Sequence, residues 1–284
     1  MVVRKVIIPA AGLGTRLFPA TKVQPKEMLP VFSNTPSGDR SVKPMVQLVF
    51  EQLYNVGLRE FCFIVGRGKR AIEDHFTPDL ECIRNLEDTG KNNQASDLDT
   101  FYEKLRTSIL MWVNQPEPKG FGNAVLLAEP FVQNEICLVH AGDGCISSKK
   151  MDYIKILLDA NEQLKADAAF LVLEVDNSKQ YGIVEGQEIE DGIIKVKTVV
   201  EKPEKPKTNL AIMAMYVFRP IIFKALKVTK PGKNGEIQLT DAIQKLIDWG
   251  LGVYAIKLDK NYTRLDIGSP EAYWEALRLS HEHT

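Results

Sequence analysis

Short apolar runs alternate with longer helix-like segments through the first two thirds of this 284-residue chain. Runs of strand length cover 60–65, 109–115 and 135–141. Between them, 43–56 places its apolar residues at helical spacing, with Pro44 suited to a first turn and Gly57 to a stop. This alternation predicts an α/β fold with a Rossmann-like, mostly parallel mixed sheet flanked by helices.

The last third of the chain has a different texture, with short strands and turns. Apolar and polar residues alternate on both sides of Asp191 and Gly192, which predicts a hairpin. Ser269 and Pro270 have the cap and first-turn residue types of a C-terminal helix that runs to about Leu279. We therefore expect a single domain, 1–284, with an α/β part over about 1–176 and a small β-rich part over about 177–284.

Two polar segments interrupt this pattern. The cluster of Ser, Thr, Pro, Gly and Asp at 33–41 predicts a surface loop. The charged, weakly helical segment 78–108 predicts an excursion from the sheet core rather than a separate domain. Neither segment by itself indicates a role.

Composition limits the partners of the chain. With 36 basic and 37 acidic residues, it has no global field to attract nucleic acid or a membrane surface, so any anion site must be local. No apolar run approaches the roughly 20 residues that span a bilayer. The four cysteines show no paired spacing, which indicates reduced thiols and a cytoplasmic protein.

The turn after the first apolar run carries the clearest chemical signal. It consists of small residues followed by three cations, Ala10, Ala11, Gly12 and Gly14, then Arg16, Lys22 and Lys26. Backbone amides in such a turn can approach a phosphate closely, and fixed cations stabilise the charge that a leaving pyrophosphate gains. These features indicate nucleotidyl transfer. A dinucleotide-binding turn fits less well, because its third glycine would fall at Leu17.

The stretch from Gly12 to Pro30 resembles the signature of sugar-1-phosphate nucleotidylyltransferases, and most of all the bacterial and archaeal UTP:glucose-1-phosphate uridylyltransferases. In that family G-x-G-T-R is followed by P-K-E-M-L-P, and both blocks are present here. The resemblance implies transfer of the uridylyl group of UTP to glucose 1-phosphate, by in-line attack assisted by Mg²⁺. It also implies a nucleotide-binding first part, a sugar-binding second part, and a homodimer or homotetramer.

The resemblance places the two metal-binding aspartates of the family at Asp143 and Asp266. Carboxylate oxygens together with phosphate oxygens are ligands that Mg²⁺ accepts. Taken alone, each residue is an ordinary aspartate in a turn beside a glycine. Relatives often carry a second acidic or polar residue after the first aspartate, whereas here Gly144 follows it, so Asp143 would be the only ligand of its turn.

The nucleotide-binding residues that the resemblance implies lie in the first turn and in segment 114–129: Ala11, Gly12, Gly14, Thr15, Gln115 and Gly120. Gln115 can offer both a donor and an acceptor to the edge of a pyrimidine. Gly120 allows a helix start to approach the nucleotide. Asn123 stands where the family commonly has histidine, a change that alters contacts without removing the turn.

The resemblance also implies the catalytic and sugar-binding residues. Arg16 and Lys26 would stabilise the pyrophosphate and the crowded α-phosphorus. Lys202 would hold the sugar phosphate as a point charge, while Glu201 accepts hydrogen bonds from the hexose and Gly182 brings the backbone to it. Without the resemblance, Glu201 and Lys202 are a solvated pair at a strand end.

A further block, GEIQLTDAI, matches the family almost letter for letter. Glu236 within it is another sugar-binding candidate. Thr240 or Asp241 has the residue type that caps the helix expected to follow, so a structural role is as well supported for them as a ligand contact.

Three alternatives remain open. A thymidylyltransferase that makes dTDP-glucose would share most of these residues. A non-catalytic regulator that binds sugar nucleotides would keep the pocket but lose the metal and cation residues, all of which are present. A nicotinamide dehydrogenase would need an acidic residue near the end of the second strand, and 64–67 has none.

Overall fold

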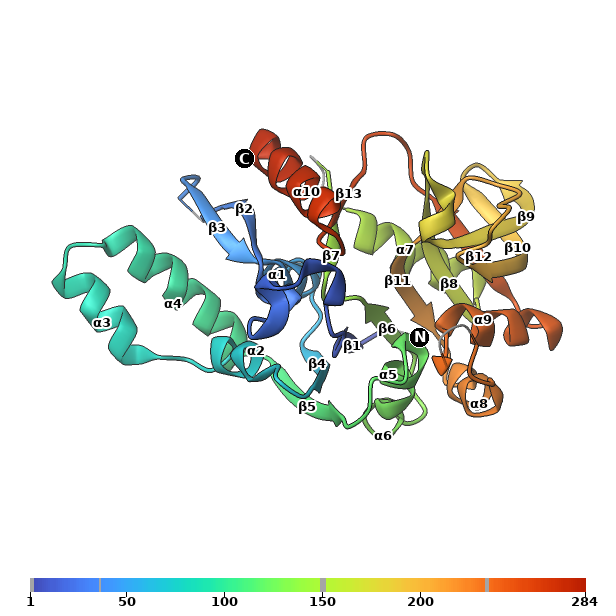
Figure 1. Ribbon diagram of the computed structural model, residues 1–284, viewed down its shortest axis with the longest axis horizontal. Coiled ribbons are helices and arrows are strands. Elements are labelled where there is room, and N and C mark those ends of the chain that lie inside the picture. Colours follow the sequence, from blue (N-terminus) through green and yellow to red (C-terminus); the bar gives the residue numbers. More distant parts are fainter. Residues whose placement is uncertain (1–2, 36, 149–151, 233–234) are drawn as a thin grey trace.

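The computed structural model describes residues 3–35, 37–148, 152–232 and 235–284. Within these residues the chain forms a nine-stranded mixed sheet in the order β5-β4-β1-β6-β11-β8-β12-β10-β9 (Figure 1). Its strands are β1 (Lys5–Ala10), β4 (Glu60–Gly66), β5 (Ile109–Gln115), β6 (Cys137–His140), β8 (Ala168–Glu174), β9 (Gly182–Glu190), β10 (Ile193–Glu201), β11 (Leu210–Phe218) and β12 (Val253–Lys257). The predicted α/β class is therefore confirmed.

Parallel pairing is concentrated in the N-terminal half of the sheet. Strands β5, β4, β1 and β6 run in one direction, so their carboxyl ends share one edge. Strand β11 is antiparallel to both β6 and β8, and β10 is antiparallel to both β12 and β9. The expectation of a mostly parallel sheet is therefore wrong for the C-terminal half, where β12 is parallel to β8 but the β9–β10 hairpin and the reversed strand β11 pair antiparallel.

Helices cover both faces of the sheet because its central strands are apolar on both sides. In β1, Val6 and Ile8 enter one buried core while Ile7 enters the other, as the alternation of side chains along a strand requires. One core is covered by α1 (Met45–Asn55) and α7 (Tyr153–Leu164), and the other by α5 (Phe121–Leu127), α8 (Ile221–Val228) and α9 (Leu239–Asp248) (Figure 1). The short helix α6 (Glu129–Val132) follows α5.

Two small sheets and a terminal helix complete the fold. Strand β7 (Gly144–Ser147) pairs with β13 (Thr263–Asp266), and β2 (Pro30–Asn34) pairs with β3 (Arg40–Pro44). Helix α10 (Pro270–His283) begins as predicted, with the Ser269 side chain accepting a hydrogen bond from the Ala272 amide. The predicted hairpin is confirmed as β9 and β10, joined at Asp191 and Gly192.

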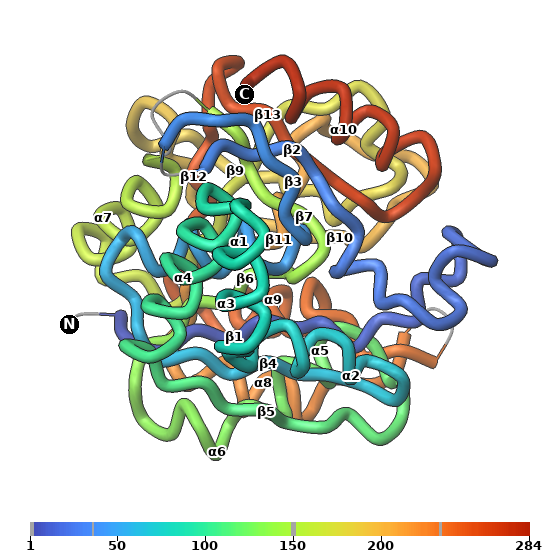
Figure 2. The backbone as a smooth tube through the Cα atoms, turned by 90° about the vertical axis from the view of Figure 1, so that its left-hand side faces the viewer, coloured from blue at the N-terminus to red at the C-terminus, as the bar shows by residue number. Residues whose placement is uncertain are grey.

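The segment predicted as a surface loop at 33–41 lies where the β2–β3 hairpin turns. The first and last residues of the segment belong to the strands, because β2 ends at Asn34 and β3 begins at Arg40. The amide of Thr35 donates to the backbone oxygen of Asp39 at 2.8 Å. The 78–108 excursion is a helical hairpin of α3 (Leu80–Asp88) and α4 (Asn92–Arg106), preceded by the short helix α2 (Arg70–His75). The α3–α4 hairpin projects from one end of the molecule, the end that faces the viewer in Figure 2.

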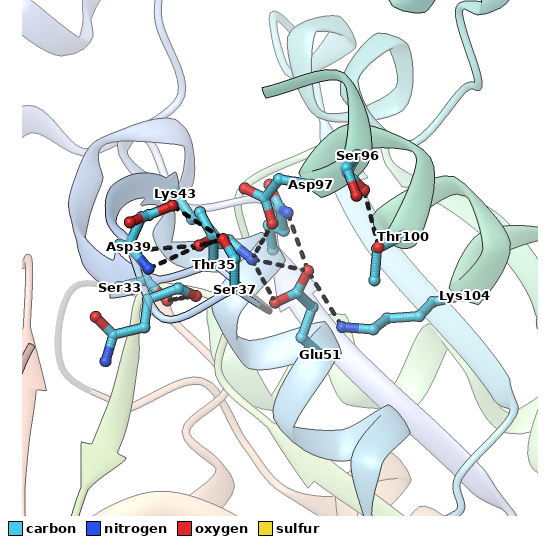
Figure 3. A network of polar contacts seen from close by, with 12 residues as sticks. Ser33, Thr35, Ser37, Asp39, Lys43, Glu51, Ser96, Asp97, Thr100 and Lys104 are labelled. Carbon is cyan, nitrogen blue, oxygen red and sulfur yellow. Dashed lines mark hydrogen bonds and ion pairs between the residues drawn. The ribbon is translucent and has the colours of Figure 1, made fainter. Parts of the chain in front are cut away.

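A buried network of charges attaches the helical hairpin to the core (Figure 3). The Glu51 carboxylate on α1 lies 3.1 Å from Nζ of Lys43 and 3.5 Å from Nζ of Lys104 on α4. The Lys43 ammonium also lies 3.3 Å from Asp97 of α4. The excursion is thus an integral part of the domain. In the part of the chain that the structure describes, no helix is both long and apolar enough to cross a membrane.

Candidate active site

The turn after β1 brings an open backbone and a cation together. It contains three short 3-10 helices, η1 (Thr15–Leu17), η2 (Ala20–Lys22) and η3 (Lys26–Met28). Gly14 has φ +66°, a conformation that side chains disfavour, and its oxygen accepts a hydrogen bond from Thr21 Oγ1 at 2.8 Å. A Cβ at Gly12 would lie 3.5 Å from Nζ of Lys26. The Lys26 ammonium therefore lies directly beside the turn.

A cleft of about 340 Å³ opens at the carboxyl edge of the parallel strands. Its lining includes ten of the residues predicted from sequence: Ala11, Gly12, Gly14, Thr15, Arg16, Lys26, Gln115, Gly120, Asp143 and Glu236. These residues come from loops after β1, β5 and β6 and from the segment before α9. All the predicted nucleotide-binding residues thus share one cleft, at the edge where open α/β sheets bind ligands.

The two aspartates meet through the small β7–β13 sheet. Asp266 ends β13 directly opposite Gly144, the residue that follows Asp143. Opposed residues in an antiparallel pair have Cα atoms about 4.5–5.5 Å apart. A Cβ at Gly144 would lie 2.8 Å from the backbone oxygen of Leu265, so the glycine permits this close pairing. The family departure at Gly144 therefore has a structural reason in this chain.

The charge state of Asp143 is controlled by Lys26, with which it forms an ion pair. Burial alone would raise the pKa of Asp143, but the attraction and hydrogen bond of the Lys26 ammonium, together with the charge of Arg264 and a backbone hydrogen bond, outweigh it and lower that pKa to about 2. Burial acts on Lys26 to lower its pKa, yet the carboxylates of Asp143, Glu27 and Asp266 together reverse this and the pKa is raised. Both groups are therefore ionised at neutral pH, and Asp143 presents a carboxylate.

Asp266 is oriented by two neighbours that sequence reasoning missed, Arg264 and Gly268. One Asp266 carboxylate oxygen lies 3.2 Å from Nη2 of Arg264, and the other accepts from the Gly268 amide at 2.9 Å. A Cβ at Gly268 would lie 3.0 Å from Nη2 of Arg16 and 3.1 Å from Oδ1 of Asp266. The Arg16 guanidinium and the Asp266 carboxylate therefore meet at Gly268.

A sequence signal existed for Arg264 but not for Gly268. Residues two apart on a strand point to the same face, so an arginine two positions before a candidate ligand is placed to pair with it. Gly268 acts through the absence of a side chain, and only the fold shows what fills that space.

Three of the four predicted sugar-binding residues, Gly182, Glu201 and Lys202, gather at the open end of the β9–β10 hairpin, outside the lining of the 340 Å³ cleft, whereas Glu236 lines that cleft. Glu201 pairs with Gly182 across the two strands, and its carboxylate lies 3.0 Å from Nζ of Lys202. Lys202 has φ +44°, a strained backbone for a non-glycine residue, and its side chain is 51% exposed. A half-exposed lysine held in a strained backbone is a candidate functional residue.

Thr240 belongs to this group rather than to a helix cap. Helix α9 already begins at Leu239, and no side chain caps it from the preceding Gln238. Thr240 Oγ1 instead donates to Oε2 of Glu201 at 3.2 Å. The prediction that Thr240 or Asp241 caps this helix is therefore wrong, because the helix starts one residue before Thr240.

Glu236 lies against the nucleotide side of the site. A Cβ at Gly120 would lie 2.8 Å from Cβ of Glu236. The neighbouring Ile237 donates its amide to the Lys119 oxygen at 2.8 Å and accepts from the Gly122 amide at 2.9 Å. The backbone around Glu236 and Ile237 is thus hydrogen-bonded to the loop that follows Gln115. A contact between Glu236 and the sugar stays a prediction.

The donor set suits a metal that completes its coordination with substrate. Among the described residues, no group of three or more His, Cys, Asp or Glu side chains could hold a metal ion by itself. Mg²⁺ commonly takes one or two carboxylates and fills its octahedron with phosphate oxygens and water. Asp143 and Asp266 therefore fit Mg²⁺ bound together with a nucleotide.

Comparison with known proteins adds an independent line of support. The model of the nucleotidyl transferase family matches residues 5–283. The UTP–glucose-1-phosphate uridylyltransferase of Pseudomonas aeruginosa is 36% identical over 99% of this chain and 97% of its own length, and that of Bacillus subtilis is 39% identical over 86% and 80%. A UDP-glucose pyrophosphorylase solved with UDP-glucose superimposes with a TM-score of 0.86 at 30% identity, and the two chains cover each other completely.

Proposed function

This chain belongs to the nucleotidyl transferase family, and we propose that it transfers the uridylyl group of UTP to glucose 1-phosphate, giving UDP-glucose and pyrophosphate. The observation that carries the proposal is the meeting of Arg16 and Lys26 with Asp143 and Asp266 at one edge of the sheet. Two cations and two carboxylates in this arrangement suit a triphosphate that is cleaved with the help of a divalent cation. The names of the similar relatives support the same reaction.

The residues of the chain act by positioning and by charge. Lys202 binds the sugar phosphate, while Glu201 and Gly182 orient the hexose. The phosphate oxygen of the sugar attacks the α-phosphorus in line, so no enzyme nucleophile or general base is needed. Arg16 and Lys26 stabilise the negative charge that develops on the departing pyrophosphate.

Mg²⁺ would be held by Asp143 and Asp266. When bound, it would neutralise phosphate charge on the triphosphate and the sugar phosphate, which repel each other. Two like charges about 4 Å apart repel by about 1 kcal/mol in water and by several times more in a cleft of lower dielectric. Lys26 and Arg264, which pair with these carboxylates, balance their charge before the ion binds.

A pyrophosphate-release assay over a grid of nucleotides and sugar phosphates, with and without Mg²⁺, tests the proposal. Release should be fastest with UTP, glucose 1-phosphate and Mg²⁺ together, and should fall sharply in Asp143→Asn. A preference for dTTP would favour a thymidylyltransferase instead. Binding of UDP-glucose without any release would favour a non-catalytic regulator. The proposal includes a homodimer or homotetramer, which light scattering of the purified protein checks.

A further inference from the structure

Gln115 has both of its amide hydrogens engaged inside the protein. It ends β5, lines the cleft and is only 6% exposed. Its side-chain nitrogen Nε2 lies 3.2 Å from the backbone oxygen of Gly120 and 2.8 Å from Oδ1 of Asn123. A primary amide carries two hydrogens, so these two acceptors use both.

The Gly120 oxygen shows which way both side-chain amides face. A backbone carbonyl only accepts hydrogen bonds, so the group of Gln115 that faces it must be the NH₂. Asn123 contacts the same nitrogen and must therefore present its oxygen. In the part of the chain that the structure describes, Oε1 of Gln115 makes no hydrogen bond. The group that Gln115 has left for a ligand is thus a pure acceptor.

An acceptor distinguishes between the pyrimidines. Uracil and thymine carry a hydrogen on N3, whereas N3 of cytosine carries a lone pair. Oε1 of Gln115 can accept from the former, and it repels the latter. The same acceptor cannot separate uracil from thymine, because both present the same N3–H.

We propose that Asn123 is a positioning residue that holds the Gln115 amide in this orientation and thereby makes the site select UTP over CTP. The inference rests on the proposed function, because it assumes that a pyrimidine nucleotide occupies the cleft. Without the Asn123 oxygen, Nε2 has a free hydrogen and only the longer 3.2 Å bond to the Gly120 oxygen still holds the amide. The amide then turns at a lower cost to donate to N3 of cytosine. A hydrogen bond of this kind is worth about a tenfold change in an equilibrium.

Three variants test the inference. Asn123→Leu removes the acceptor at similar volume, Asn123→Ala removes it without adding bulk, and Asn123→Asp keeps an oxygen acceptor. Dissociation constants for UTP and CTP are measured by calorimetry and kcat/KM for each by pyrophosphate release, with thermal melting to check folding. The ratio of UTP to CTP affinity should fall about tenfold in Asn123→Leu and Asn123→Ala and should be retained in Asn123→Asp.

The outcomes separate the two proposals. A wild-type protein without preference for UTP would contradict the proposed function itself. A wild-type preference that survives unchanged in Asn123→Leu and Asn123→Ala would overturn the role of Asn123 alone. Equal weakening of both nucleotides would also overturn it, because it would show that Asn123 supports the loop and does not orient the amide. Failure of Asn123→Asp to retain the preference would show that the acceptor oxygen is not the feature that matters.

Discussion

Asp266 lies directly opposite Gly144 in the antiparallel pairing of β7 and β13. This relationship brings Asp266 next to Asp143, although the two aspartates belong to distant parts of the chain. This close pairing requires a residue without a side chain at position 144, because a Cβ on Gly144 would lie only 2.8 Å from the Leu265 oxygen. The placement of the two candidate metal ligands therefore depends on a two-stranded sheet rather than on the large one.

Replacing Gly144 by alanine should damage both the fold and the site. The new Cβ would be 2.8 Å from the Leu265 oxygen, so β13 must move away from β7. We expect a loss of about 1–3 kcal/mol in the free energy of unfolding and at least a tenfold loss in turnover. Urea unfolding and pyrophosphate release measure the two effects, and an unchanged stability would show that the strands tolerate the extra atom.

Replacing Gly268 by alanine should affect activity more than stability. Its Cβ would displace only the flexible ends of Arg16 and Asp266, so we expect less than about 1 kcal/mol of destabilisation. A shift of the Arg16 guanidinium and the Asp266 carboxylate by a fraction of an ångström should lower kcat by about tenfold or more.

The double variant Gly268→Ala with Arg16→Ala provides the control. If Gly268 acts through Arg16, the two losses in kcat should be less than multiplicative. Fully multiplicative losses would show that Gly268 acts on something else.

Arg16 should matter for turnover and little for product binding. Its guanidinium lies beside Asp266 at Gly268. In the proposed reaction it stabilises the charge on the leaving pyrophosphate, which UDP-glucose lacks. Arg16→Ala should therefore lower kcat by about 10²–10³-fold, while the dissociation constant of UDP-glucose in calorimetry changes only slightly. Equal losses in both quantities would show that Arg16 binds the nucleotide in general.

His140 should make stability depend on pH. Burial lowers its pKa to about 4, although the ring also bonds to the Ala141 oxygen at 2.8 Å. The unfolded chain binds a proton at this histidine below about pH 6.5, and the native chain does so only near pH 4. The free energy of unfolding should therefore fall by about 3 kcal/mol from this group as the pH drops through that window.

Urea unfolding of the wild type and of His140→Gln at several pH values measures this contribution. The difference between the two proteins should shrink as the pH falls from 7 to 4, since the variant lacks the titrating ring. A constant difference would mean that the native histidine is protonated as readily as the unfolded one.

Glu51 should be essential for the attachment of α4. Glu51→Gln leaves the buried Lys43 ammonium, which lies 3.1 Å from the carboxylate, with less compensation (Figure 3). We expect a loss of about 3 kcal/mol in the free energy of unfolding. Glu103→Gln on α4 is the matched control, because its ion pair with Arg106 is exposed and should contribute less than about 1 kcal/mol.

Much of the fold was predictable because its signals are local. The apolar runs that became β4 and β5, the cap at Ser269 and the hairpin at Asp191 and Gly192 each depend on neighbouring residues in the chain. The direction of β11 was not predictable, because pairing with β6 and β8 depends on contacts between distant segments. The same holds for the attachment of 78–108, which depends on contacts of α4 with Lys43 and Glu51 and on apolar side chains of α4 that enter the core.

The candidate site divides in the same way. The sequence by itself determined which residue types follow the strands, and hence that Arg16, Lys26 and Gln115 would face one edge of the sheet. Only the tertiary structure decided that Arg264 pairs with Asp266 and that the Asn123 oxygen accepts a hydrogen bond from the Gln115 amide. The physical reason is that these roles depend on distances of about 3 Å between side chains from separate elements, and strand packing sets those distances.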